Sequence, residues 1–153
     1  MIDSLLDKKR LLEACIAPVR SRIEQINGSL EQAREASQQE TKSSAGDKYE
    51  TGREMMRIQS DMQALHLYEA QDLLHRLDRI DASQIHTTVR PGAVVRTDAG
   101  LYFICQSLGP VILDGVEYQT MSLASPLGKV LKGLSAGDTA PFRDGIVSLL
   151  AVF

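Results

Sequence analysis

Two long stretches with the apolar periodicity of a helix, separated by a short polar segment, constrain the fold of this chain more than any other feature. Apolar residues recur every three or four positions in both stretches. The first stripe is Ile16, Val19, Ile23, Ile26, Leu30 and Ala33, and the second is Met55, Ile58, Met62 and Leu65, continuing at Leu67, Ala70, Leu74 and Leu77. Helices of similar length joined by a short loop pack antiparallel. We therefore predict a helical hairpin over residues 1–83, with its turn near 42–48.

Local signals refine this hairpin. Pro18 lies inside the first stretch, where it removes a backbone donor, so we expect a kink there or a boundary between two helices. Either Ser44 or Asp47 is expected to cap the second helix, with Glu50 completing a capping box after Asp47. The methionines near the turn are interpreted as seam packing, with a contact surface as the alternative; they are Met55, Met56 and Met62.

The second half, residues 84–153, is patterned as a small antiparallel sheet with one helix. Short apolar runs alternate with turn signals. The expected strands are 93–97, 101–105, 111–113, 116–123, 139–143 and 146–153. The last run is apolar enough to predict a central strand buried on both faces. Ser125 and Pro126 suit the start of a short helix, and Gly133 suits its end. The predicted fold class is therefore α+β.

Composition excludes several classes of function. The formal net charge is −3 and no basic cluster is present, which disfavours autonomous binding of DNA or RNA. The N-terminus has no signal-peptide pattern, and no apolar run is long enough to span a bilayer. We expect a cytoplasmic protein in which Cys15 and Cys105 are buried or half-buried thiols.

The run Ser125-Pro126-Leu127, followed by Leu131, Gly133 and Gly137-Asp138, resembles the C-terminal signature of the bacterial Gre transcript-cleavage factors. In that family an FKBP-like domain follows an antiparallel coiled coil, which is the order predicted above. The resemblance implies a monomer that docks on RNA polymerase and inserts its coiled coil into the secondary channel, meeting nucleic acid only within the transcription complex. It also implies partner contacts along the hairpin and around the motif: Tyr49, Arg53, Ser125, Pro126, Leu127, Lys129 and Lys132.

The family's chemistry uses acidic residues at the tip of the coiled coil, which help hold a Mg²⁺ ion in the active site of the polymerase. No intrinsic cofactor is expected, because the polymerase supplies most of that site. Counting back from Tyr49, the two acidic positions fall on Lys42 and Ala45, and neither side chain ligates Mg²⁺. The candidate substitutes are Asp47, Glu50 and Glu54. The preferred interpretation is that these acids cap the helix or favour its positive end.

Several functions therefore stay open. The leading one is a Gre-type factor that modulates elongation and possesses no enzyme activity of its own, at most stimulating RNA cleavage by the polymerase. One alternative is a Gre-like regulator that does not promote cleavage, and another is a structural adaptor whose hairpin dimerises. A prolyl isomerase is disfavoured, because this half of the chain has no Trp and few aromatic residues to line a prolyl pocket; they are Tyr102, Phe103, Tyr118, Phe142 and Phe153.

Overall fold

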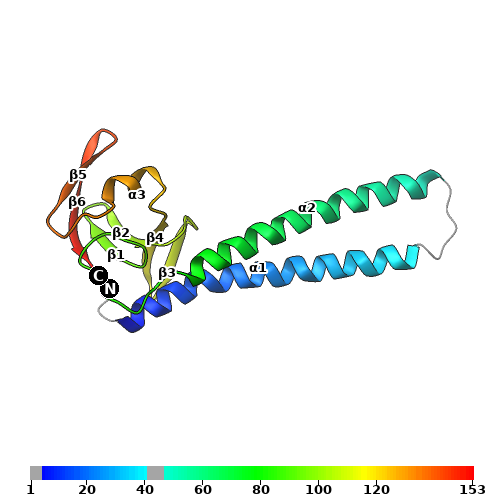
Figure 1. Ribbon diagram of the computed structural model, residues 1–153, viewed down its shortest axis with the longest axis horizontal. Coiled ribbons are helices and arrows are strands. Elements are labelled where there is room, and N and C mark those ends of the chain that lie inside the picture. The colour runs from blue at the N-terminus through cyan, green and yellow to red at the C-terminus, as the bar shows by residue number, and fades with distance from the viewer. Residues whose placement is uncertain (1–4, 41–46) are drawn as a thin grey trace. The chain divides into compact units, whose positions relative to one another are not determined.

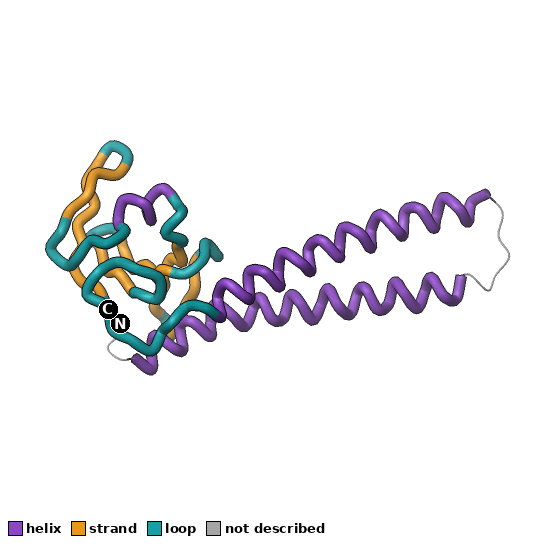
Figure 2. Tube along the Cα trace, in the orientation of Figure 1, coloured by secondary structure: helices purple, strands orange, loops and turns teal. Residues whose placement is uncertain are grey.

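The computed structural model describes residues 5–40 and 47–153, and it shows an α+β protein (Figures 1 and 2). Two long helices are followed by a six-stranded, mostly antiparallel sheet and one short helix, as the sequence predicts. The elements are α1 (Leu5–Glu40), α2 (Asp47–Asp78), β1 (Val94–Thr97), β2 (Gly100–Ile104), β3 (Pro110–Leu113), β4 (Val116–Met121), α3 (Pro126–Leu131), β5 (Thr139–Phe142) and β6 (Gly145–Val152). By compactness the chain divides into two units, one of residues 18–74 and one of residues 1–17 with 75–153.

The unit of residues 18–74 is an antiparallel hairpin of α1 and α2 (Figure 1). The predicted stripe of α1 lies at least half-buried along its length: Val19, Ile23, Ile26, Leu30 and Ala33. On α2 the covered positions are Met56, Ser60, Gln63, Leu67 and Ala70. The interpretation of Met55 and Met62 as seam residues is wrong, because these side chains are 68% and 56% exposed. The reason is geometric, since they lie on a different face of α2 from the row that is covered.

The helix α1 runs unbroken through Pro18, so the predicted boundary between two helices is wrong. Proline removes one hydrogen bond but does not forbid a helix that is held on both sides of it. Buried side chains stand immediately before and after it, namely Cys15, Ile16 and Val19. Their burial outweighs the lost bond. The predicted kink at this residue stays a prediction.

The sheet has the strand order β3-β4-β2-β1-β6-β5. Every neighbouring pair is antiparallel except β2 and β4, which run parallel from Tyr102 opposite Gln119 to Ile104 opposite Met121. The prediction of a wholly antiparallel sheet is thus wrong at this pair. After β2 the chain moves out to the edge strand β3 and returns as β4 between them. The Thr120 hydroxyl supports this path, because it donates to Gly109 O at 2.6 Å and accepts from Leu108 N at 2.8 Å.

Residues from the sheet, from α3 and from the segment before β1 form the core of this unit. Its buried members are Val89, Ala93, Val95, Ile104, Met121, Leu131 and Leu149. The expectation that the last strand is buried on both faces is wrong. In β6 only Leu149 is buried, whereas Ile146 is 67% exposed and Leu150 is 52% exposed. This alternation is typical of an antiparallel strand with one face on the core and the other in solvent.

The first turns of α1 belong to the same unit as the sheet. The buried ammonium of Lys8 donates to the carbonyl oxygens of Gln84 and Phe153, the latter at 3.1 Å. The Arg10 guanidinium makes two hydrogen bonds to the Asp114 carboxylate, each at 2.8 Å. These polar contacts join the first turns of α1 to the rest of their own unit, residues 1–17 with 75–153, which is called here the β unit.

Both cysteines are free and buried, as the sequence predicts. Cys15 on α1 and Cys105 after β2 share a hydrogen bond between their side chains. This bond lowers the pKa of Cys15, and together with burial it raises the pKa of Cys105. Within the part of the chain that the structure describes, neither long helix has a stretch apolar enough to cross a bilayer.

Candidate functional site

The Ser125 turn is the best-defined local structure in the region that the sequence singled out. Ser125 has extended backbone angles, φ −67° and ψ 158°, and caps α3 as predicted. Its Oγ accepts a hydrogen bond from Gly128 N at 3.1 Å and donates one to Ser122 O at 2.6 Å. Pro126 occupies the first turn, where its missing N–H has no cost. The hydroxyl therefore joins the end of β4 to the start of α3.

Gly128 is required at this turn by close approach. A Cβ atom at this position would stand 2.1 Å from Ser122 O and 2.7 Å from Leu123 Cα. Both neighbours are backbone atoms, so no side-chain rotation relieves the contact. At the other end of α3, Gly133 has φ +79°, and its N–H donates to Val89 O at 2.9 Å. Gly133 thus ends the helix in the left-handed conformation that the sequence predicts.

The predicted partner-binding residues of this motif divide into two groups. Leu127 is half-buried against the core, and Ser125 is committed to the turn. Pro126, Lys129 and Lys132 are exposed. The exposed group is the part of the motif that is available to a partner, and its role in binding stays a prediction.

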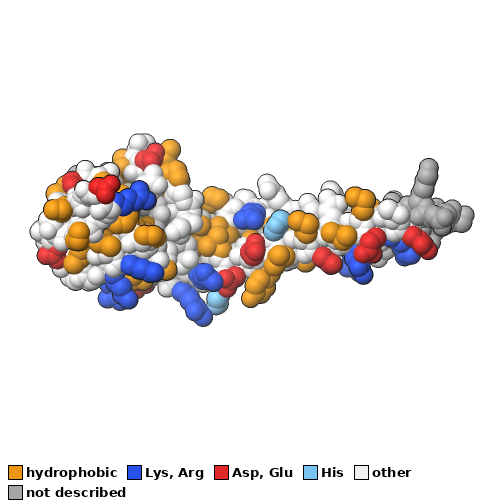
Figure 3. Space-filling model, turned by 90° about the horizontal axis from the view of Figure 1, so that it is seen from above, with side chains coloured by type: hydrophobic (Ala, Val, Ile, Leu, Met, Phe, Trp, Pro, Cys, Tyr) orange, Lys and Arg blue, Asp and Glu red, His pale blue; other side chains and the backbone are white. Residues whose placement is uncertain are grey.

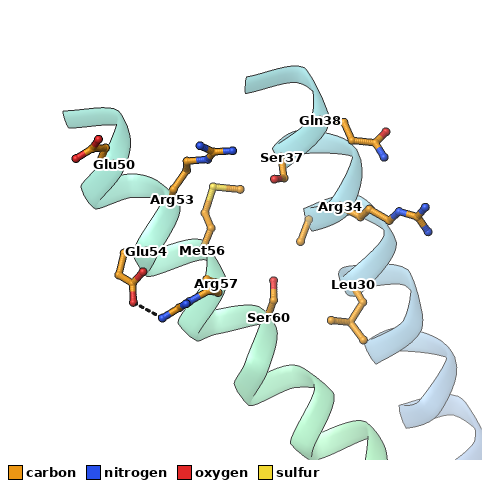
Figure 4. A pocket seen from close by; sticks show the side chains of 11 residues that line it. Leu30, Arg34, Ser37, Gln38, Glu50, Arg53, Glu54, Met56, Arg57 and Ser60 are labelled. Atoms are coloured by element: carbon orange, nitrogen blue, oxygen red, sulfur yellow. Dashed lines mark hydrogen bonds and ion pairs between the residues drawn. The ribbon is translucent and has the colours of Figure 1, made fainter. Parts of the chain in front are cut away.

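The hairpin has a groove between α1 and α2 with a volume of about 610 Å³ (Figure 4). From α2, the side chains of Arg53 and Met56 point across it toward α1, where Leu30 and Ser37 line the other wall. A second hollow of about 300 Å³ is lined by small and polar side chains, including Ser60 and Gln63. Within the described chain the buried Gln63 Oε1 has no hydrogen-bond partner. Small and polar residues on the inner face of α2 therefore leave the helices incompletely packed here.

The described acids near the turn are not arranged to hold a metal ion. Glu54 Oε1 accepts a hydrogen bond from Arg57 Nη2 at 2.7 Å, so this carboxylate is already paired. Glu50 and Glu54 are among the residues that line the groove, and their carboxylates lie on the side of α2 away from α1 (Figure 4). Among the residues described, no three His, Cys, Asp or Glu side chains gather as metal ligands. These residues do not fit a Mg²⁺ site within this chain.

Several predicted positions at the turn lie outside the described residues. They are Lys42, Ala45 and the candidate cap Ser44, together with the side chains of Asp47 and Tyr49. The structure does place Asp47 as the first residue of α2. The helix therefore begins inside the range 42–48 that the sequence assigns to the loop.

The aromatic residues of the β unit do not gather around a prolyl pocket. Phe103 and Tyr118 are fully buried, and Tyr102 packs against the core. Phe142 lies beneath the Arg143 guanidinium, 5.1 Å from ring centroid to Cζ. Core packing accounts for three of the five aromatic side chains considered for an isomerase.

The sequence reasoning missed two features of α2. One is that small and polar residues, including Ser60 and Gln63, lie on the face of α2 that packs against α1 and leave a hollow there. The other is that the apolar residues from Met55 to Leu65 are exposed. The signal was present, because the apolar residues of α2 do not follow one helical face throughout. The drift between Leu65 and Leu67 marks the change from an exposed row to a covered one.

No protein-family model matches the chain, and no curated protein matches it. The solved structures similar to it include the following two. One, described as the structure of the transcription factor Gfh1, is 19% identical with a TM-score of 0.37, covering 90% of this chain and 92% of that one. The other is the GreA factor homolog 1 (Gfh1) protein of Thermus thermophilus, 19% identical with a TM-score of 0.31, covering 95% and 94%.

Proposed function

We propose that this chain is a Gre-type transcription factor that binds RNA polymerase and modulates elongation without enzymatic activity of its own. The observation that carries the proposal is the Ser125-capped helix α3 on a sheet that follows a two-helix hairpin. The motif around Ser125 resembles the Gre C-terminal signature, and the order of the elements is the one that the resemblance predicts. In this proposal the β unit, which we infer to be FKBP-like, docks on the polymerase and the hairpin enters its secondary channel.

The proposal favours binding without stimulated cleavage. Lys42 and Ala45 stand where the resemblance expects carboxylates, and Glu54 is paired with Arg57. A carboxylate held by an arginine is a poorer ligand for Mg²⁺ than a free one, because binding the metal breaks that pair. The remaining candidates for this chemistry are Asp47 and Glu50.

Binding is tested by co-sedimentation of the full chain with the cognate RNA polymerase. The variant Lys129→Glu plus Lys132→Glu reverses two exposed charges, one on α3 and one at its C-cap. The capping contact of Lys132 is made by its backbone N–H to Gly128 O, and Ser125 and the core residues are unchanged. Arg90→Glu is the matched control, since Arg90 is exposed in the same unit and lies outside the motif. We expect the double variant to bind at least about tenfold more weakly and the control to bind normally. Absence of binding by the unmodified chain refutes the proposal.

Cleavage is tested on a stalled, backtracked complex with Mg²⁺, by measuring the length of the transcript. We expect no shortening of the RNA 3′ end beyond that of the polymerase alone. If shortening is observed and is lost in Asp47→Ala plus Glu50→Ala, these two acids replace the missing pair. If it is observed and survives that double substitution, neither acid supplies the chemistry.

A further inference from the structure

A row of large apolar side chains lies exposed along α2. Met55, Ile58, Met62, Leu65 and Tyr68, called here the outer stripe, are 68%, 51%, 56%, 56% and 68% exposed. Steps of three and four residues place them on one side of the helix. Hydrophobic side chains reach the surface at intervals along the hairpin (Figure 3). Large apolar side chains concentrated on one helix face mark an interaction surface more often than isolated ones do.

The outer stripe is not the face that packs on α1. The row Met56, Ser60, Gln63 and Leu67 is the covered one, and three of these residues line the hollows between the helices. At 100° per residue, the middle of that row is roughly 170° from the middle of the outer stripe. α2 therefore carries two nearly opposite contact faces, and a helix of this kind packs between two partners. One of the partners is α1.

We propose that the second partner is another copy of this chain, paired with the first through the outer stripe. A two-fold interface requires a surface that matches itself. The steps from Met55 to Leu65 are three, four and three, and they are the same in both directions along the helix. Antiparallel pairing sets Met55 of one copy opposite Leu65 of the other, and Ile58 opposite Met62. The spacing is also that of a coiled-coil seam.

The area of the outer stripe suits a weak dimer. With the exposures above, the five side chains present on the order of 600 Å², against roughly 800 Å² per partner in a standard interface. The rim charges Glu54 and Arg57 are already paired within one copy, so association leaves neither of them unpaired. Asp61 lies on the same flank, and antiparallel pairing brings the two Asp61 carboxylates toward each other. Added salt is therefore expected to tighten the dimer by screening this repulsion.

Sedimentation of the full chain, without polymerase, tests the proposal over concentrations from roughly micromolar to several hundred micromolar. We expect a monomer–dimer equilibrium that tightens as NaCl is added. Met62→Glu introduces a charge in the middle of the stripe and is expected to weaken the dimer at least about tenfold. Gln71→Glu introduces the same charge on an exposed position of α2 outside the stripe and is the control. Because Met62 is exposed, circular dichroism is expected to show both variants folded.

A covalent test mixes the Ile58→Cys chain with the Met62→Cys chain under mild oxidation. We expect a disulfide between the two chains, because antiparallel pairing sets these positions opposite each other, and none when Gln71→Cys replaces either variant, since the two native cysteines are buried. A chain that stays monomeric at every concentration overturns the proposal, as does a dimer that Met62→Glu leaves intact. A monomer whose binding to polymerase is lost in Met62→Glu assigns the stripe to the polymerase and also overturns it. Failure to bind polymerase, in contrast, leaves the self-association result standing.

Discussion

Gly128 and Gly28 offer the same substitution with opposite expected effects. Both lie in helices, and neither has a positive φ, so replacement by Ala brings the same gain in helix propensity of up to about 1 kcal/mol. The added Cβ meets nothing within 4 Å at Gly28, whereas at Gly128 it stands 2.1 Å from Ser122 O and 2.7 Å from Leu123 Cα. The sign of the change in stability therefore depends on the surroundings of the methyl group alone.

At Gly128 the substitution forces the turn to open by about an ångström, since a carbon and an oxygen normally approach to roughly 3.3 Å. Overpacking of this kind costs about 1–3 kcal/mol. The movement also disturbs the cap between Ser125 Oγ and Gly128 N, which contributes about 1 kcal/mol more. After the propensity gain of about 1 kcal/mol is subtracted, we expect Gly128→Ala to lower the free energy of unfolding by about 1–3 kcal/mol.

Urea unfolding of the full chain, followed by near-ultraviolet circular dichroism of the tyrosines, measures this effect in the unit that holds the buried Tyr118. Helical circular dichroism is the probe for Gly28→Ala, which lies in the hairpin unit and is expected to be neutral to slightly stabilising. A Gly128→Ala protein as stable as the unmodified chain would refute the reasoning, because the turn would then accept a Cβ without strain.

Three further predictions concern polar side chains and thiols of the β unit. Ser125→Ala is expected to lower unfolding free energy by about 1–2 kcal/mol in urea, and Ser125→Thr, which keeps the hydroxyl, to restore most of it. Burial lowers the pKa of Lys8 from 10.5 to about 8, so the unfolded chain binds more protons between these values and stability rises with pH across this window, by up to roughly 3 kcal/mol. Lys8→Met should lack that rise in a urea titration against pH, and an unchanged slope would contradict it. Cys15 and Cys105 should react with a thiol reagent only after unfolding, so rapid modification of the native chain would show that they are accessible.

Elements that depend on local signals were predictable from the sequence. The cap at Ser125, the left-handed Gly133 and the turn at Asp114-Gly115 are each fixed by the conformations that these residues prefer. The hairpin was predictable because apolar periodicity over dozens of residues has few other solutions. The cap and turn signals act within a few residues of the position that they determine, and the helical stripe repeats every three or four residues.

The features that could not be predicted depend on contacts distant in sequence. Nothing local distinguishes a β4 that pairs with β3 alone from one that also lies parallel to β2. The exposure of Ile146 and Leu150 depends on which elements cover β6, and an apolar run alone does not reveal that. On α2 the apolar row from Met55 to Leu65 is exposed, whereas packing against α1 covers a row that includes Ser60 and Gln63. In each case tertiary packing decides between local alternatives of similar quality.

The Ser125 motif shows why a recognisable sequence is stronger support for a fold than for a binding partner. The most constrained residues of this stretch make contacts within the chain, with the motif residues Ser125 in the cap and Leu131 in the core, and with Gly128, which lies between them, in the close turn. A chain that kept this turn for stability alone would keep the same three residues. The side chains that a partner can reach are Pro126, Lys129 and Lys132, together with others elsewhere on the surface. Reversal of the two lysine charges therefore separates the two roles, since it leaves the turn intact and changes only what a polymerase would meet.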